Sequence, residues 1–195
     1  MKYLDEFREK DPFQAILSKI KSLPPQPLSF MEVCGTHTVA ISKAGLRNLL
    51  PSGIRLLSGP GCPVCVTAFE DVDRIIMLAG EKRADKRFII TSFGDMMRVP
   101  GSHSSLLKEK AKGADIRIVY SPADALTVAR ENPDREVVFF SVGFETTSPT
   151  SAATILHAEK EGLGNFSIIS NNKLIPPAME LLLEDKSTAL DGFLC

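Results

Sequence analysis

Two short segments of the sequence concentrate residues that can bind metals or exchange electrons. Cys34-Gly-Thr-His37 and Cys62-Pro-Val-Cys65 together hold three of the four cysteines and one of the three histidines in 195 residues. Thiolates and imidazoles are the soft and borderline ligands that hold iron, copper or zinc, and a Cys-x-x-Cys pair can also cycle between a dithiol and a disulfide. The sequence therefore predicts metal chemistry, redox chemistry or both at these segments.

Cys34 follows an expected strand and comes just before an expected helix. The positive end of a helix dipole favours a thiolate over a thiol, and the thiolate is the form that binds metal. His37, three residues later, can act as a ligand, a proton donor or a partner of the ligand. The alternative is structural, with Cys34 a buried apolar side chain and His37 a helix-capping group.

The segment Gly59-Pro-Gly61 allows a sharp, side-chain-free approach to Cys62, and Pro63 constrains the turn so that Cys62 and Cys65 can face one another. This pattern is typical of a redox dithiol. A structural zinc site usually has four ligands, and the chain carries only one Cys-x-x-Cys knuckle. Zinc held jointly by both cysteine segments, with Cys34, His37, Cys62 and Cys65 as ligands, stays open as an alternative.

Two further loops carry charged side chains directly after expected strands. Glu145 lies in Gly143-Phe-Glu-Thr-Thr147 and is either a helix N-terminal cap or a functional acid. Asp95 and Arg98 lie in the other loop, which comes earlier in the chain. The simplest interpretation of this pair is an internal salt bridge. Neither loop matches a phosphate-binding glycine motif.

Composition limits the classes of function. Lys plus Arg total 23 and Asp plus Glu total 24, so the net charge of -1 gives no electrostatic case for nucleic acid or an anionic membrane. The N-terminal ten residues are highly charged and lack the apolar stretch of a signal peptide, and no run approaches the roughly 20 apolar residues of a membrane span. We expect a cytoplasmic protein, in which four cysteines favour metal or redox roles over structural disulfides.

Short apolar strands alternate with amphipathic helices along the chain. This rhythm predicts parallel sheets with right-handed crossovers, so the expected fold class is α/β with two consecutive Rossmann-like units, the second incomplete, after an N-terminal helical arm. The expected divisions are an arm at 1–27, a first α/β domain with the cysteine segments at 28–121, and a truncated second α/β domain at 122–195. The expected strands are 29–33, 54–58, 88–92, 116–120, 137–142, 166–170 and one near 190.

Local signals place the helix ends. A capping box at Thr67–Glu70 predicts the start of a helix that buries Phe69, and a second box begins at Ser121 with Pro122 in the first helical position. Gly45 is expected to interrupt a helical stretch over 39–50. Because ligands in such folds bind beyond the carboxyl ends of the strands, we expect one shared rim or cleft. Its expected members are Cys34, Cys62, Cys65, Asp95, Glu145 and Asn171.

Taken in order, four segments of the chain resemble the HypD family of hydrogenase maturation proteins. They are Met31–Thr38, Ser58–Thr67, Phe93–Gly101 and Val142–Thr147. The resemblance runs to the last residue, but the family is longer, so this sequence corresponds to roughly its first half.

The resemblance implies a metal-centre assembly scaffold with redox activity, in contrast to an enzyme that turns over a small substrate. With the chaperone HypC and the cyanide donor HypE as partners, iron receives two cyanides and one carbon monoxide before delivery to nickel-iron hydrogenase. Cys34 would anchor the iron with help from His37, and Cys62 and Cys65 would be the redox pair. The resemblance also implies Glu145 as a catalytic residue and assigns binding of the iron group to Thr36, Asp95, Arg98, Thr146 and Thr147.

Full-length members of the family also bind a [4Fe-4S] cluster through further cysteines beyond this sequence. The resemblance therefore implies a fragment that lacks the cluster and is inactive by itself. Two other functions fit the same residues: a general thiol-disulfide oxidoreductase that uses only the Cys62/Cys65 pair, and a zinc-stabilised interaction module.

Overall fold

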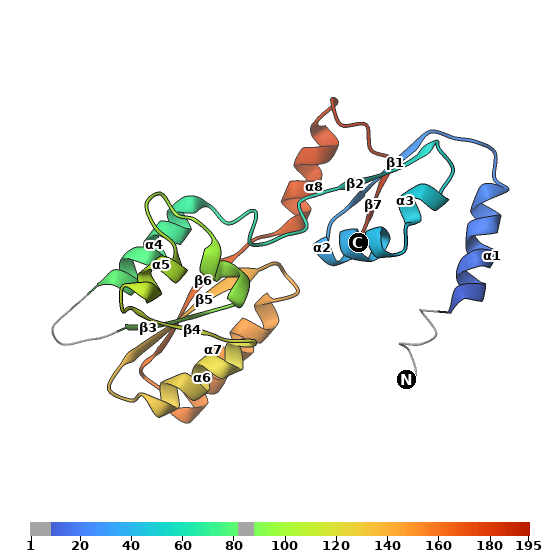
Figure 1. Ribbon diagram of the computed structural model, residues 1–195. Helices are drawn as coiled ribbons and strands as arrows, with labels where there is room; N and C mark the ends of the chain where they lie inside the picture. Colours follow the sequence, from blue (N-terminus) through green and yellow to red (C-terminus); the bar gives the residue numbers. More distant parts are fainter. Residues whose placement is uncertain (1–8, 82–87) are drawn as a thin grey trace. The chain divides into compact units, whose positions relative to one another are not determined.

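The computed structural model describes residues 9–81 and 88–195 of the chain. Its contacts divide the protein into two units: unit 1 comprises residues 1–61 and 176–195, and unit 2 comprises residues 62–175. Residues 1–8 of the expected arm lie outside the described residues. Each unit contains a wholly parallel sheet, so the expected α/β class with two parallel sheets and an N-terminal helix is confirmed (Figure 1).

Unit 1 has a three-stranded sheet in the order β2-β1-β7. Leu28 pairs with Ile54 between the first two strands, and Glu32 pairs with Leu194 between β1 and β7. The first strand has β2 on one side and β7 on the other, so the topological switch point lies at its carboxyl end. The elements are α1 (Lys10–Lys21), β1 (Leu28–Glu32), α2 (Gly35–Lys43), α3 (Leu46–Leu49), β2 (Ile54–Ser58), α8 (Ile175–Glu184, whose first residue belongs to unit 2) and β7 (Gly192–Leu194).

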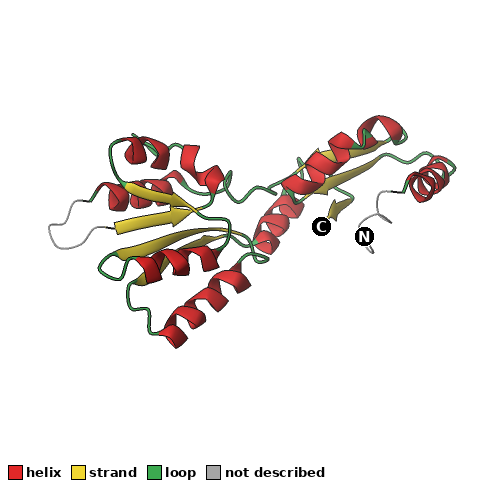
Figure 2. Cartoon of the chain, turned by 60° about the horizontal axis from the view of Figure 1, so that its bottom comes forward, coloured by secondary structure: helices red, strands yellow, loops and turns green. Residues whose placement is uncertain are grey.

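Unit 2 has a four-stranded sheet in the order β4-β3-β5-β6. In Figure 1 helices α4 and α5 cover one face of this sheet and α6 and α7 cover the other, and Figure 2 shows the same layers from below. The elements are α4 (Phe69–Gly80), β3 (Phe88–Ser92), the 3-10 helix η2 (Gly94–Arg98), α5 (Leu106–Ala111), β4 (Asp115–Ile118), α6 (Pro122–Glu131), β5 (Glu136–Gly143), α7 (Ser148–Glu161) and β6 (Phe166–Asn172).

The core of unit 2 is built on β5, whose residues from Val137 to Gly143 are all buried. Alternate side chains serve opposite faces of the sheet, because successive residues of a strand point in opposite directions. Phe140 packs toward the α4 and α5 side with Ile75 and Leu106, while Phe139 packs toward the α6 side with Ala125.

The grouping of strands differs from the division expected from the sequence. A break near Ser121 would leave β3 and β4 in the first domain, but β3 pairs with β5, so both belong to unit 2. Unit 1 is instead completed by β7 from the far end of the chain. Alternation of strands and helices indicates parallel strands but carries no information on which sheet each strand joins.

Helix ends follow the local signals in two places and depart from them in a third. Ser121 forms the expected reciprocal capping box with Asp124, and Gly45 adopts a left-handed φ of 62° between α2 and α3. The capping box expected at Thr67 is wrong, because the Thr67 hydroxyl donates to the carbonyl of Pro63 and α4 starts after Ala68 without a side-chain cap. As a result Phe69 is exposed and does not join the buried face of α4.

Candidate functional site

Cys34 lies directly beyond the carboxyl end of β1, at the switch point of the unit 1 sheet, and is the N-cap residue of α2. No side-chain hydrogen bond caps this helix, but the Thr36 hydroxyl and the N–H groups of Thr36 and His37 lie close enough to lower the pKa of the Cys34 thiol. Burial acts in the opposite direction but is outweighed by these groups. The lowered pKa makes the thiolate, the form that binds metal, more accessible at Cys34 than at an ordinary cysteine.

The loop after β2 packs its backbone directly against Cys34. The N–H of Gly35 donates to the carbonyl of Gly61 at 3.1 Å, and a Cβ atom on Gly61 would lie 2.4 Å from the Cα of Cys34. A Cβ on Gly59 would meet Met31 at 2.6 Å. The sequence indicated that these glycines permit a close approach to Cys62, and in the structure their close approach is to Cys34 and β1.

His37 lies in the first turn of α2, where its N–H donates to the carbonyl of Cys34 at 2.9 Å. Its Nδ1 atom is buried and finds no hydrogen-bond partner within the part of the chain that the structure describes. A buried polar atom without a partner is uncommon in folded proteins, and at this site it leaves a nitrogen lone pair or N–H free for a ligand.

In unit 2, the Cys62 and Cys65 side chains face one another across a single turn. Their sulfur atoms are 2.7 Å apart, and the N–H of Cys65 donates to the Cys62 sulfur at 3.3 Å. The hydrogen bond to Cys62, together with burial and the charge of Cys62, raises the pKa of the Cys65 thiol. Val64 between them packs into the unit 2 core, so the turn is anchored. The two cysteines are free and arranged as a dithiol pair.

Asp95 and Arg98 are both exposed on η2, which is held in place by the buried Met96 and Met97. Among the described residues neither charged side chain forms an ion pair or hydrogen bond, so the structure does not contain the internal salt bridge that the sequence favoured. Both side chains are thus available at the surface of unit 2.

The neighbouring loop after β5 holds Glu145, Thr146 and Thr147. An oxygen of the Glu145 carboxylate accepts a hydrogen bond from the N–H of Ile175 at 2.8 Å. Helix capping was one of the two roles expected of Glu145. The N–H that it binds, however, is 30 residues away in sequence, at the first residue of α8. Thr146 is exposed, and Thr147 packs beneath Gly143, where a Cβ would lie 2.5 Å from it.

The η2 and Glu145 loops flank the switch point of the unit 2 sheet, which lies between β3 and β5. Asn171 is the last residue but one of β6 at the same edge, where it pairs with Val142 and is buried with its Nδ2 atom unpartnered among the described residues. Asp95, Glu145 and Asn171 are thus placed at one sheet edge within unit 2. A single rim shared with Cys34 of unit 1 stays a prediction.

Sequence reasoning missed two groups that hold these loops. Glu32, one of the most deeply buried side chains of unit 1, pairs with Arg47 at 2.6 Å. In unit 2, Asp73 accepts hydrogen bonds from the backbone and hydroxyl of Ser102, which lower its pKa and tie the end of the η2 loop to α4. An acid next to the apolar residues of a short strand is the one sequence signal that could have pointed to Glu32.

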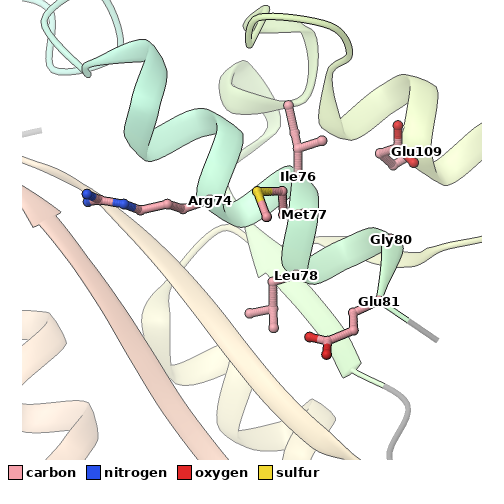
Figure 3. Close-up of a pocket in the computed structure, with 7 residues that line it drawn as sticks. All are labelled: Arg74, Ile76, Met77, Leu78, Gly80, Glu81 and Glu109. Atoms are coloured by element: carbon pink, nitrogen blue, oxygen red, sulfur yellow. The ribbon is translucent and has the colours of Figure 1, made fainter. Parts of the chain in front are cut away.

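A pocket of about 670 Å³ lies along α4 and is lined by none of the predicted site residues (Figure 3). No three His, Cys, Asp or Glu side chains converge on a metal position within residues 9–81 and 88–195. No helix in these ranges is both long and apolar enough to cross a membrane. The pocket is lined by Arg74, Ile76, Met77, Leu78, Gly80, Glu81 and Glu109.

Comparison with known proteins identifies the family. A model described as "HypD: Hydrogenase formation hypA family" matches residues 11–195. The chain belongs to the HypD family. It is 47% identical to hydrogenase maturation factor HypD of Rhodobacter capsulatus and 42% identical to that of Escherichia coli, in each case over the whole chain and about half of the relative (52% and 53%).

An archaeal relative extends the comparison. A putative hydrogenase expression/formation protein of Methanocaldococcus jannaschii is 43% identical over 86% of this HypD-family chain and 45% of its own length. The chain therefore spans about half the length of the curated relatives it matches. Membership of the HypD family is thus established, and the resemblance predicted from the sequence is confirmed.

Proposed function

We propose that this chain is the iron-anchoring part of a scaffold on which the Fe(CN)2CO group of nickel-iron hydrogenase is assembled, and that it is inactive by itself. The observation that carries the proposal is the acidic Cys34 thiol at the N-terminus of α2, in a chain of the HypD family. Iron that binds cyanide and carbon monoxide needs a soft anchoring ligand and open coordination positions, and a single partly exposed thiolate offers both.

His37 and the dithiol complete the proposed site. The unpartnered Nδ1 of His37 would hold a proton or a ligand next to the iron, since it is buried in the same helical turn. Cys62 and Cys65 would supply electrons, because a dithiol that closes to a disulfide releases two electrons and two protons. Cys62 follows Gly61 by one peptide bond, so the two cysteine motifs are linked through the loop that packs on Cys34.

The remaining predicted residues would bind the iron group or its partners. Asp95, Arg98 and Thr146 are exposed and line the switch point of unit 2, which supports a binding role. Glu145 would act as an acid at this edge of unit 2, where its carboxylate accepts a hydrogen bond from the N–H of Ile175. The proposed partners are the chaperone HypC and the cyanide donor HypE, in the cytoplasm.

The test is infrared spectroscopy of a full-length HypD-family protein in which this chain replaces the corresponding half, purified without oxygen from cells that express the other maturation proteins and lack their own HypD. Cyanide and carbonyl stretching bands are expected on the complex with the chaperone. They should vanish in Cys34→Ala and persist in Cys195→Ala, a matched change at another free cysteine. A wild-type complex without these bands would refute the scaffold function for this chain.

The dithiol geometry also supports a second function, a general thiol-disulfide oxidoreductase. That function needs Cys62 and Cys65 but not Cys34. Reduction of unrelated protein disulfides at equal rates by wild type and Cys34→Ala would favour it over the scaffold. A zinc-stabilised module predicts stoichiometric zinc in the purified protein and unfolding on chelation, and unchanged folding after chelation would exclude it.

A further inference from the structure

Asn172, the last residue of β6, is a polar side chain to which the proposed function gives no role. It pairs in register with Gly143 on β5, and the N–H of Lys173 continues this ladder by donating to the Gly143 carbonyl at 2.9 Å. Gly143 is the last residue of β5, directly before the loop over residues 144–147. Asn172 therefore lies beside the strand end at which this loop begins.

Both ends of the Asn172 amide are used in hydrogen bonds within unit 2. The Ser141 hydroxyl donates to its Oδ1 atom at 3.1 Å, and its Nδ2 atom donates to the Ser148 hydroxyl at 2.8 Å. Because the hydrogen of Ser141 is directed at Asn172, the 2.9 Å bond between the Ser141 and Ser151 hydroxyls has Ser151 as its donor. Asn172 thus connects β6 with β5 on one side and with α7 on the other.

These hydrogen bonds form a chain with a single direction, which ends at the backbone of the loop. The Ser148 hydroxyl accepts from Asn172 and donates its own hydrogen to the Phe144 carbonyl at 3.3 Å. The chain that starts at Ser151 therefore has four bonds, the last of them to Phe144. Hydrogen bonds linked in this way polarise one another when they are shielded from water, so the chain acts as a unit.

The Phe144 carbonyl belongs to the same rigid peptide group as the N–H of Glu145, so its direction sets how the loop continues. The Glu145 carboxylate accepts a hydrogen bond from the N–H of Ile175, only three residues after Asn172. The loop and the segment over 172–175 are thus joined twice, once through Asn172 and once through Ile175. Glu145 and the exposed Thr146 lie between these two connections and the start of α7.

We propose that Asn172 is a positioning residue, which acts through Ser148 to hold the Phe144 peptide group and with it the Glu145 and Thr146 side chains. The inference rests on the role proposed above for this loop in binding the iron group. It adds a residue of the neighbouring strand that controls the loop without touching the iron group.

The test measures hydrogen exchange of the Ile175 amide by NMR in the labelled full chain, because this N–H reports whether the Glu145 carboxylate stays in place. Ser148→Ala removes the link between Asn172 and Phe144. It should speed exchange of Ile175 by about 3- to 10-fold, since loss of one hydrogen bond of typical net strength changes a local opening equilibrium by about that factor. Ser148→Thr keeps the hydroxyl and should stay within about twofold of wild type.

A second substitution tests the direction of the chain. Asn172→Asp keeps an acceptor for Ser141 but replaces the donor to Ser148 with a carboxylate oxygen. The Ser148 hydroxyl then turns its hydrogen to the new carboxylate and releases the Phe144 carbonyl, so we expect exchange of Ile175 to be as fast as in Ser148→Ala. If circular dichroism shows that Asn172→Asp does not fold, the two Ser148 variants decide.

Thr154→Val is the matched control, since it removes another hydroxyl of α7, which bonds to the Thr150 carbonyl outside this chain. It should leave exchange of Ile175 unchanged. The Val119 amide, which donates to the Ser92 carbonyl in the same unit, is the internal reference and reports any general loss of stability. Normal exchange of Ile175 in Ser148→Ala, equal acceleration of Val119, or equal rates for Ser148→Ala and Ser148→Thr would each overturn the inference.

The infrared experiment on the full-length protein links the positioning role to the iron group. Ser148→Ala should weaken the cyanide and carbonyl bands and Ser148→Thr should restore them, whereas bands of full strength in Ser148→Ala would overturn the inference. The exchange assay contains no iron. Absent bands in the wild type together with the expected exchange pattern would therefore refute the scaffold function alone.

Discussion

The two units of the protein are stabilised in different ways. Unit 2 buries apolar side chains on both faces of its sheet, with Phe139, Phe140 and Ile75 wholly buried. In unit 1 the buried apolar side chains are few, and the pair of Glu32 with Arg47 lies among them. The buried apolar residues described in unit 1 are Leu17, Met31, Ile41 and Leu56.

The proposed iron ligand, Cys34, thus lies in unit 1, the unit with fewer buried apolar side chains. Unit 1 compensates with contacts that are specific in geometry: an ion pair between the buried Glu32 and the exposed Arg47, and glycines that let two backbones touch. Such contacts fix the orientation of a few groups, whereas apolar burial is non-directional. We infer that unit 2 supplies stability and that the contacts of unit 1 supply the geometry around Cys34.

The largest expected effect comes from Phe140→Ala in unit 2. Removal of a fully buried phenylalanine typically costs 3–5 kcal/mol, of which part is the cavity left behind. Hydrogen exchange resolved by peptide should show this loss in unit 2. Leu56→Ala is the comparison in unit 1, where we expect about 2 kcal/mol. Equal loss of protection in both units after either change would show that they unfold together and would remove the contrast.

The second effect tests the backbone contact in unit 1. Gly61→Ala adds a Cβ that would lie 2.4 Å from Cys34, so one of the two segments must shift, at a typical cost of 1–3 kcal/mol. Gly164→Ala is the matched control, because nothing lies within 4 Å of its added Cβ. Thermal unfolding followed by circular dichroism should show a lowered Tm only for Gly61→Ala. A normal Tm for Gly61→Ala would mean that the loop is not packed on Cys34.

The smallest effect concerns acid stability of unit 2. Arg117 and then Arg135 lower the pKa of Asp115, to which both are paired. A lowered folded-state pKa stabilises the fold above the unfolded value of about 3.9, and this contribution is lost as pH falls through the folded-state pKa.

We therefore expect Asp115→Asn to cost about 1 kcal/mol at neutral pH and progressively less in acid. Urea unfolding at a series of pH values measures the difference from wild type. The control is Asp134→Asn, at an exposed carboxylate that forms no ion pair with the described residues. A constant difference between Asp115→Asn and wild type across pH would contradict the assignment.

Several elements could be predicted from local sequence alone. The strands at 54–58 and 88–92 have the expected bounds, and the Ser121 capping box forms with both of its hydrogen bonds. The capping box expected at Thr67 does not form, although the same sequence motif is present there. There the preceding Cys62–Cys65 turn offers the Pro63 carbonyl to the Thr67 hydroxyl, and this local acceptor displaces the cap.

For the candidate site, sequence reasoning predicted where the cysteines lie but not the groups that hold their loops. Cys34 at a helix start and the facing Cys62 and Cys65 followed from residue type and spacing. Arg47 could not be predicted as the partner of Glu32, because the two are 15 residues apart and meet only when α3 packs beside β1. The absence of an Asp95 to Arg98 bond could not be predicted either, because a spacing of three residues in η2 permits the pair without requiring it.

By itself, the sequence determined the alternation of strands and helices, the places where helices must stop, and the concentration of thiols in two loops. These are properties of residues close together in the chain, which local periodicity and spacing encode. Only the tertiary structure decided that β7 pairs with β1, that Gly61 touches Cys34 and that Glu145 accepts a hydrogen bond from the N–H of Ile175. Each of these is a contact between segments far apart in the chain, whose formation depends on how the packed sheets bring them together.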